Sequence, residues 1–184
     1  GDMPAGVDQD AVQRVIDDSF TTGTGEGDTI DAVLVVKNGR LVVEEYNGWD
    51  AEEFHPSWSM AKSVTSSLVG ILAGRGEIDV FEPASAPEWA DPSDPRHEIT
   101  VDDLLRMSSG LEWTEDYDDP TGDVLTILGG GGAADRAAYA ASKPLAHEPD
   151  TIWYYSTGTA NIVAREVAEK VGFGEEYSTW MTEN

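Results

Sequence analysis

Residues 8–20 carry an apolar stripe with a helical period. The stripe consists of Val12, Val15, Ile16 and Phe20. Positions three and four apart lie on one face of a helix, so this spacing predicts an amphipathic helix. The stretch 21–28 is rich in Gly and Thr, and it predicts where the helix ends.

The next segments follow a different pattern. Residues 30–36 and 41–46 are rich in β-branched and other apolar residues, and Lys37-Asn38-Gly39-Arg40 separates them. Asn-Gly between two such runs is a strong hairpin signal, because both residues tolerate the positive φ angles of a two-residue turn. The sequence therefore predicts two antiparallel strands.

From residue 59 onward the pattern is mainly helical. Residues 59–74 carry one apolar stripe, and Gly74 and Gly76 supply the stop. The stripe consists of Met60, Val64, Leu68, Ile71 and Leu72. The following stretch, 79–98, holds four Pro and several acids, which predicts an ordered loop rather than a regular element.

A capping pattern marks the next helix. Thr100 is followed three residues later by Asp103, which resembles a capping box with Asp in place of Glu. We expect a short helix from this cap through Leu104, Leu105 and Met107, closed by Gly110.

Three more helices are expected towards the C-terminal end. Residues 133–142 are Ala-rich, and residues 158–171 form an amphipathic pattern stopped by Gly172. A last helix would contain Tyr177, Trp180 and Met181. The run Gly129 to Gly132 lacks the Gly-Lys-Ser/Thr ending of a phosphate-binding loop, so we expect it to be a flexible connection.

The charge of the chain narrows the range of partners. The 184 residues include 36 Asp and Glu against 11 Lys and Arg, a formal net charge of −25. Such a chain repels phosphate, so we expect no nucleic-acid partner and no anionic membrane surface. The acids are dispersed among apolar-periodic segments and six Trp, which indicates a folded protein with a solvated acidic face. This pattern suits a halophilic environment, and it also fits an ordinary acidic protein.

Metal and redox chemistry find little support in the sequence. The chain has no Cys, which excludes disulfides, thiolate metal sites and a cysteine nucleophile. The three histidines, His55, His97 and His147, are isolated from one another. An acidic cluster lacks the spacing of a calcium-binding loop. It comprises Glu115, Asp116, Asp118 and Asp119. We therefore expect neither a metal nor a cofactor.

The sequence does not indicate a compartment. No apolar run approaches the roughly 20 residues that span a bilayer, and the first residues do not resemble a signal peptide. The chain begins at Gly1 rather than Met, so a removed targeting segment stays possible.

Ser59 and Lys62 are the first candidates for chemistry. They are three residues apart on one predicted helix, which places the hydroxyl and the amine on the same face. A serine attacks only when a base takes its proton, and an amine is a base only when it is neutral. Apolar surroundings and the positive end of a helix both favour the neutral form. By itself the pattern also fits a serine that caps the helix and a solvated lysine.

The second candidate segment is Trp153-Tyr154-Tyr155-Ser156-Thr157-Gly158, which follows Pro149 and precedes a predicted helix. A loop that enters a helix can hold a side chain over a cleft. A Tyr beside an ammonium can shuttle protons, because the positive charge lowers its pKa from about 10. Alternatively, Tyr154 and Tyr155 are interior aromatic residues with satisfied hydroxyls.

Four segments, taken in order, resemble the β-lactamase, penicillin-binding-protein and esterase superfamily of serine hydrolases. The likeness is greatest to the class C-like branch that contains 6-aminohexanoate-dimer hydrolases and related carboxylesterases. It covers nearly the whole chain. The segments are Ser59-Met60-Ala61-Lys62, Leu104-Leu105-Arg106-Met107-Ser108-Ser109-Gly110-Leu111, Lys143-Pro144-Leu145 and Tyr155-Ser156-Thr157-Gly158.

The resemblance implies roles for five residues. Ser59 would be the nucleophile, Lys62 the general base, and Tyr155 the residue that assists proton delivery to the leaving group. The family's tyrosine motif usually has Asn or Ser at its third position, where this chain has Thr157. Thr157 would therefore contact substrate with a hydroxyl and no amide, which disfavours β-lactam recognition. Tyr117 resembles a substrate-contacting loop tyrosine, and an aromatic anchor for the acidic loop explains it equally well.

The resemblance also implies a fold and a reaction. We expect an α/β fold of the β-lactamase and transpeptidase type, with an antiparallel sheet flanked by helices and a helical region. The reaction would be hydrolysis of a small-molecule ester or amide through an acyl-enzyme, as in carboxylesterases or amide-oligomer hydrolases. The alternatives are a β-lactamase or D,D-carboxypeptidase, and a non-catalytic sensor domain.

The expected domain organisation is that of an incomplete domain. Residues 1–58 would supply a helix and the first hairpin of the sheet, and residues 59–184 the helical region with the active-site motifs. The resemblance implies a third motif, of Lys-Thr-Gly or His-x-Gly type, and three further strands, none of which is in this sequence. We therefore expect the chain to be the N-terminal part of one domain, completed by a C-terminal segment or chain.

Overall fold

The structure is a computed structural model that describes residues 5–22, 30–129 and 134–184. The chain divides into two compact units, Gly1–Pro56 and Ser57–Asn184. That both units belong to one domain stays a prediction. In the described ranges, no helix is both long and apolar enough to cross a membrane.

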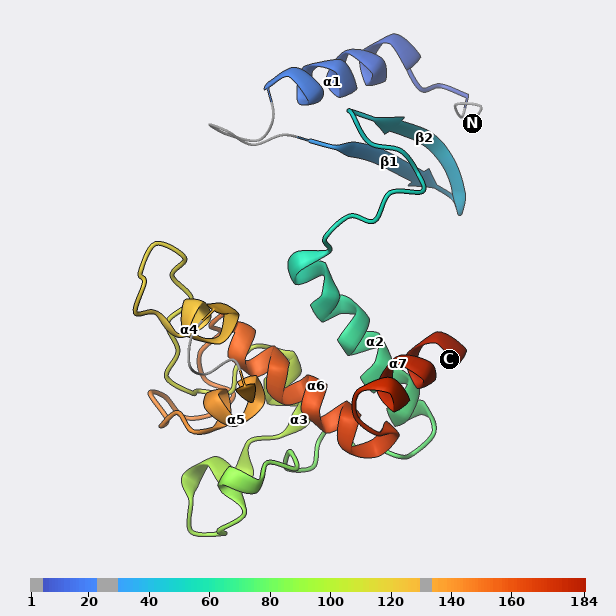
Figure 1. Cartoon of the computed structure of the whole chain (residues 1–184). Coiled ribbons are helices and arrows are strands. Elements are labelled where there is room, and N and C mark those ends of the chain that lie inside the picture. The colour runs from blue at the N-terminus through green and yellow to red at the C-terminus, as the bar shows by residue number, and fades with distance from the viewer. Residues whose placement is uncertain (1–4, 23–29, 130–133) are drawn as a thin grey trace. The chain divides into compact units, whose positions relative to one another are not determined.

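The first unit contains one helix and one hairpin (Figure 1), as predicted. The helix α1 spans Gln9–Thr22. The strands β1 (Ala32–Lys37) and β2 (Arg40–Tyr46) pair antiparallel. Asn38 and Gly39 both have positive φ, 53° and 73°, which is the geometry of the two-residue turn that Asn-Gly favours.

The hairpin leaves part of its apolar surface uncovered. Val42 and Val43 of β2 are buried, as is Ile16 of α1. Four other apolar side chains of the hairpin are exposed to solvent. They are Leu34, Val35, Val36 and Leu41. A register shift between Val35 and Val36 interrupts the alternation of the strand. A two-stranded sheet is marginal by itself, and here it leaves these four apolar side chains exposed.

The second unit is helical and is organised around α6 (Thr157–Val171). Helices α2, α3, α4, α5 and α7 all pack against it. They span Ala61–Gly74, Val101–Leu105, Asp123–Gly129, Arg136–Ala141 and Glu175–Glu183. Short 3₁₀ turns lie at Trp58–Met60, Pro87–Trp89 and Pro95–Glu98.

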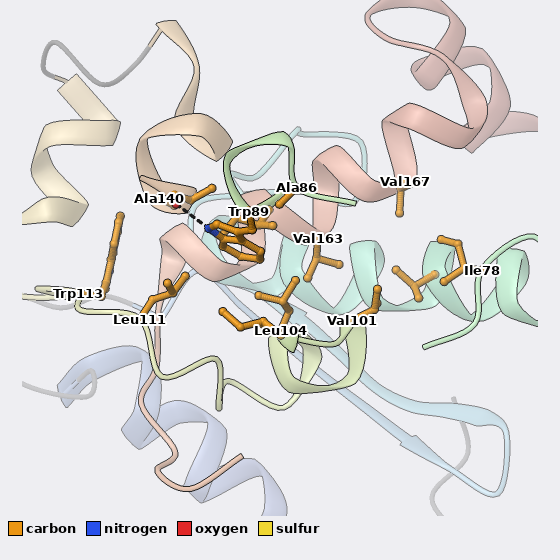
Figure 2. Close-up of a cluster of buried hydrophobic side chains, with 14 of the residues drawn as sticks. Ile78, Ala86, Trp89, Val101, Leu104, Leu111, Trp113, Ala140, Val163 and Val167 are labelled. Carbon is orange, nitrogen blue, oxygen red and sulfur yellow. Dashed lines mark hydrogen bonds between the residues drawn. The ribbon is translucent and has the colours of Figure 1, made fainter. Parts of the chain in front are cut away.

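The core of this unit lies along α6 and includes side chains from the Pro-rich stretch (Figure 2). Trp89 is 1% exposed, and its indole Nε1 donates to the carbonyl of Ala141 over 2.8 Å. The hydrogen bond satisfies the one polar atom of an otherwise apolar ring. The predicted ordered loop at 79–98 is confirmed, and it closes the core instead of lying free on the surface.

Two helix predictions need correction. The capping box of Thr100 and Asp103 is present, but α3 ends at Leu105 and Met107 has a left-handed backbone with φ 57°. Gly110 serves another purpose: a Cβ there would lie 2.3 Å from the carbonyl oxygen of His147. It permits two loops to cross closely.

Helix α4 was not predicted, because its seven residues lie between a Pro-Thr-Gly segment and a Gly run that both predict loops. Of the expected flexible connection, Gly129 is the last residue of α4, and residues 130–132 lie outside the described residues. The other expected helices, at 136–141, 157–171 and 175–183, are present.

Candidate active site

Lys62 is the centre of the predicted site. Its Nζ lies 3.1 Å from the Oγ of Ser59 and 3.2 Å from the Oγ1 of Thr157. The same atom lies 5.0 Å from the centroid of the Tyr155 ring. The structure therefore brings together four of the residues that the sequence singled out, from the beginnings of α2 and α6.

The local structure around Ser59 presents its hydroxyl to Lys62. Ser59 lies in the 3₁₀ turn Trp58–Met60, and Lys62 lies in the first turn of α2. The N-cap of α2 is Met60, with no side-chain cap, and the Ser59 hydroxyl contacts Lys62 instead. Trp58 has φ 44°, an unfavourable backbone angle for a bulky residue directly before Ser59. Serine as a helix cap, the alternative explanation of this pattern, is not what the structure shows.

The beginning of α6 supplies the opposite side of the site. Ser156 is its N-cap, and the buried hydroxyl of this serine accepts from the backbone N–H of Thr159 over 2.9 Å. Tyr155 and Thr157, on either side of the cap, both contact Lys62. The cap thus fixes the helix start that presents two of the predicted site residues.

Tyr155 meets Lys62 through its ring. A lysine ammonium near the face of an aromatic ring is attracted by the electron density of that face. Among the hydrogen bonds of the described residues, none joins Lys62 to the Tyr155 hydroxyl. Tyr155 therefore contacts Lys62 through its ring and not through its hydroxyl.

Glu115 is a site residue that the sequence analysis considered only as a possible calcium ligand. Its Oε2 accepts from Trp113 Nε1 over 2.5 Å and from the backbone N–H of Thr157 over 2.8 Å. Its Oε1 accepts from the hydroxyl of Tyr117 over 3.0 Å and from the hydroxyl of Thr157. The carboxylate also lies at the N-terminal end of α6, where the helix dipole favours negative charge.

A signal for Glu115 was present in the sequence. Trp113, Glu115 and Tyr117 are each two residues apart in a segment without helical pattern. In an extended segment such residues point to the same side. The alternation indicates that the three side chains act together, although it does not show which partner they meet.

Tyr117 joins the site through Glu115 rather than through Lys62. Partial burial and the hydrogen bond to the Glu115 carboxylate raise the pKa of the Tyr117 hydroxyl above its ordinary value. The side chain is 56% exposed, so it is accessible from solvent. Its predicted contact with substrate stays a prediction.

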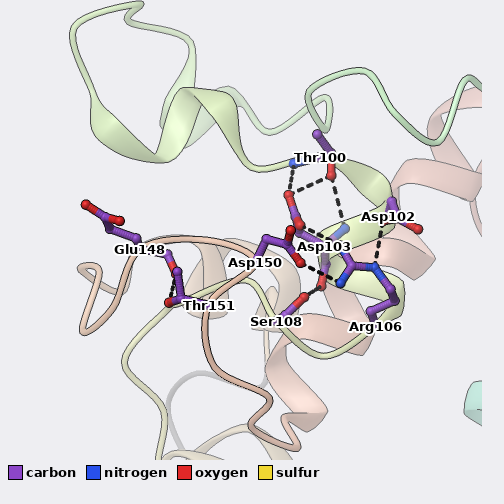
Figure 3. Close-up of polar contacts among 8 residues, drawn as sticks. All are labelled: Thr100, Asp102, Asp103, Arg106, Ser108, Glu148, Asp150 and Thr151. Atoms are coloured by element: carbon purple, nitrogen blue, oxygen red, sulfur yellow. Dashed lines mark hydrogen bonds and ion pairs between the residues drawn. The ribbon is translucent and has the colours of Figure 1, made fainter.

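The loop that leads to Tyr155 is tied to the end of α3 (Figure 3). Arg106 donates to Asp102, Asp103 and Asp150 over 2.6, 3.0 and 2.6 Å. The backbone N–H of Asp150 donates to Ser108 O, and that of Tyr154 to Met107 O. The second resembling segment, residues 104–111, thus holds the tyrosine segment in place.

Two cavities adjoin the site. One, of about 290 Å³, is lined by Lys62, by hydroxyls of α2 and by apolar side chains of α3 and α6 that include Leu104 and Val163. The other, of about 170 Å³, is lined by residues that include Trp113, Tyr154 and Ser156. Neither lining includes Ser59. Both volumes lie below the usual range for a pocket that binds a small organic ligand.

The arrangement allows a proton to pass between Ser59 and Lys62. Hydroxyl and amine are within hydrogen-bond distance, which is the geometry that a nucleophile and its base require. Within the described residues, no group of three or more His, Asp or Glu side chains is placed to hold a metal ion.

Comparisons with known proteins identify the family of the chain. The model of the Beta-lactamase family matches residues 21–184. A 6-aminohexanoate-dimer hydrolase of Paenarthrobacter ureafaciens is 31% identical over 99 residues, which are 52% of this chain and 25% of that protein.

Two solved structures have the same fold. The "Putative 6-aminohexanoate-dimer hydrolase" of Bacillus anthracis has a TM-score of 0.67 and 23% identity over 90% of this chain and 44% of its own. A "putative beta-lactamase" of Bacteroides dorei has a TM-score of 0.65 and 18% identity over 89% of this chain and 46% of its own. The chain spans a quarter of the length of the matched hydrolase and less than half of each solved structure. With a family match over residues 21–184 and this fold, the chain belongs to the β-lactamase family of serine hydrolases.

Proposed function

We propose that the chain carries the nucleophile side of a serine-hydrolase active site, with Ser59 as nucleophile, Lys62 as general base and Tyr155 as the third member. The observation that supports this most is the position of Lys62. Its Nζ is 3.1 Å from the Ser59 Oγ, beside the Tyr155 ring. A nucleophile and a base within hydrogen-bond distance, with a third group next to the base, form the common pattern of covalent hydrolases.

The reaction would proceed in two stages. The Ser59 hydroxyl gives its proton to neutral Lys62 while Oγ attacks the carbonyl carbon of an ester or amide. The bond to the leaving group then breaks, and that group takes a proton from Lys62, assisted by Tyr155. Water attacks the resulting acyl-serine and gives a proton to Lys62. The bond between the acyl carbon and Ser59 Oγ then breaks, Oγ takes that proton back from Lys62, and the acid is released. The backbone N–H of Ser59 would be one donor to the developing oxyanion.

Esters and simple amides are the substrate class that we favour. One relative is a 6-aminohexanoate-dimer hydrolase. The hydroxyl of Thr157 is held between Lys62 and Glu115, and the side chain carries no amide. A site that relies on an amide group at this position to recognise a β-lactam would lack that donor. β-Lactamase or D,D-carboxypeptidase activity is therefore a second outcome of the test.

We also propose that a C-terminal segment or chain completes the sheet. The hairpin leaves Leu34, Val35, Val36 and Leu41 exposed. Contiguous apolar side chains on a two-stranded sheet favour the addition of further strands. Co-expression with candidate completing segments, followed by gel filtration, tests this: we expect one segment to co-elute with the chain, and a chain that elutes alone with every segment opposes the proposal.

A fluorophosphonate probe tests the catalytic assignment. We expect covalent labelling of Ser59, none in Ser59→Ala, a very slow reaction in Lys62→Ala, and a small remnant of turnover in Tyr155→Phe. Ser67→Ala, which removes an exposed hydroxyl of the same helix outside the cavity lining, is the matched control and should label normally. A protein whose Ser59 resists the probe would instead be the non-catalytic sensor domain.

Intact-mass measurement then identifies the substrate class. The protein is incubated with short-chain nitrophenyl esters, amide dimers and ampicillin. An adduct or turnover with esters or amides supports the proposal, whereas a stable adduct or turnover with ampicillin alone assigns the protein to the β-lactam-directed class.

A further inference from the structure

We propose that Glu115 is a positioning residue that directs the Lys62 lone pair towards Ser59 by fixing the hydrogen-bond direction of the Thr157 hydroxyl. This role rests on the proposed function of Ser59 and Lys62. The observation behind it is that the two oxygens of the Glu115 carboxylate accept from different kinds of donor. Oε2 accepts from two N–H groups, and Oε1 accepts from two hydroxyls.

The direction of each hydrogen bond follows from which groups can donate a proton and which can only accept one. An ionised carboxylate only accepts, so the Thr157 hydroxyl has to give its single proton to Glu115. The oxygen of Thr157 then faces Lys62 Nζ, 3.2 Å away, as an acceptor. Lys62 must therefore donate to Thr157.

This constraint matters most when Lys62 is neutral. A neutral amine has two N–H bonds and one lone pair. Two N–H bonds and the lone pair occupy the three staggered positions about the last side-chain bond. Because Thr157 requires an N–H, the lone pair is excluded from that position and can face the other close partner, the Ser59 Oγ at 3.1 Å. That orientation is the one in which the amine can accept the serine proton.

Substitution by Gln would reverse the constraint while it preserves the shape of the side chain. The indole N–H of Trp113 and the backbone N–H of Thr157 can only donate, so they select the Gln oxygen at the Oε2 position. The Gln NH₂ group then occupies the Oε1 position and donates to both hydroxyls. The Thr157 proton must turn away, and Lys62 Nζ, 3.2 Å away, is an acceptor within its reach. The lone pair of Lys62 would then be bound to Thr157 instead of Ser59.

The test is a double-mutant cycle on the rate at which a fluorophosphonate labels Ser59. We expect Glu115→Gln to slow labelling by about 10-fold or more, since a misdirected base forfeits part of the usual gain from general-base catalysis. Thr157→Val removes the hydroxyl at nearly constant shape. In that background Glu115→Gln should change the rate by less than about 2-fold, because no hydroxyl remains to be reversed.

Two further variants separate direction from structure. Asp118→Asn makes the corresponding change, from carboxylate to amide, at an exposed position of the same segment outside both cavity linings and should label at the parent rate. Glu115→Ala removes the acceptor but adds no donor, so it should label no more slowly than Glu115→Gln, even if its thermal midpoint is lower. If Glu115 merely supports the loop, Glu115→Ala should label more slowly than Glu115→Gln.

The outcomes are distinguishable. A labelled parent in which Glu115→Gln is equally harmful with and without the Thr157 hydroxyl overturns the role of Glu115 and leaves the proposed function intact. A labelled parent that Glu115→Gln does not slow has the same consequence. If Ser59 of the parent is not labelled at all, the proposed function fails and this role fails with it.

Discussion

Arg106 donates through Nη1 to Asp150 over 2.6 Å, and this pair joins the end of α3 to the loop that leads to Tyr155. The two residues are 44 positions apart in the chain. Both Met107 and Asp150 have left-handed backbones, with φ of 57° and 62°. The ion pair therefore helps to hold two strained segments against each other, next to the candidate site.

We expect Arg106→Ala to loosen the Tyr155 segment. The substitution removes the guanidinium that donates to Asp102, Asp103 and Asp150. The buried carboxylate of Asp103 then lacks a compensating positive charge. The thermal midpoint should fall by a few degrees, and hydrogen exchange of the Tyr154 amide should become faster. Arg136→Ala, at an exposed arginine of α5, is the control and should change neither. If the exchange rate of the Tyr154 amide is unchanged in Arg106→Ala, the backbone hydrogen bonds alone hold the Tyr155 segment in place.

The contact between Gly158 and Trp113 predicts opposite effects for two glycine substitutions. A Cβ at Gly158 would lie 2.5 Å from the Trp113 ring, whose indole is held by Glu115. Gly158→Ala should therefore destabilise the protein by about 1–3 kcal/mol, as overpacked cores do. Gly70, inside α2, has open space around the same position. Gly70→Ala should stabilise by about 0.5–1 kcal/mol. Urea unfolding measures both, and equal effects would contradict this account.

The pair of Asp123 and Lys143 predicts acid sensitivity. Burial alone would raise the pKa of the Asp123 carboxyl, but hydrogen bonds from Lys143, Tyr139 and the Thr114 amide outweigh it and hold the pKa below its ordinary value. A lowered carboxyl pKa contributes stability that is full above about pH 4, the unfolded value, and is lost as the pH falls through the folded pKa.

Asp123→Asn should therefore be less stable than the parent at neutral pH and should lose less stability between about pH 5 and pH 2. Asp118→Asn, at an exposed position of the neighbouring loop, serves as control and should keep the parent's slope. Unfolding midpoints across this range give the measurement. Parallel curves for Asp123→Asn and the parent would refute the linkage.

The net charge of −25 predicts a stability that depends on salt. Like charges on a small chain repel one another, and screening over about 3 Å at 1 M salt relieves most of the repulsion between exposed groups. The thermal midpoint should rise between low and molar potassium chloride. A midpoint that does not change with salt would leave the halophilic interpretation without support.

The sequence by itself determined the elements whose stability is local. The stripe at 158–171, the Asn-Gly turn and the capping box of Thr100 and Asp103 each depend on residues within a few positions of one another, and all three are present. It also determined that Ser59 and Lys62 meet, because three residues on a helix start span less than one turn.

Only the tertiary structure decided which distant groups complete the site. Lys62 and Thr157 are 95 residues apart, and Glu115 reaches Thr157 from 42 residues away. No periodicity links such positions, because their distance depends on how α2 and α6 pack, and that packing depends on the whole core. For the same reason, the sequence showed Gly110 as a helix stop, whereas packing made it the point at which the loop of His147 crosses.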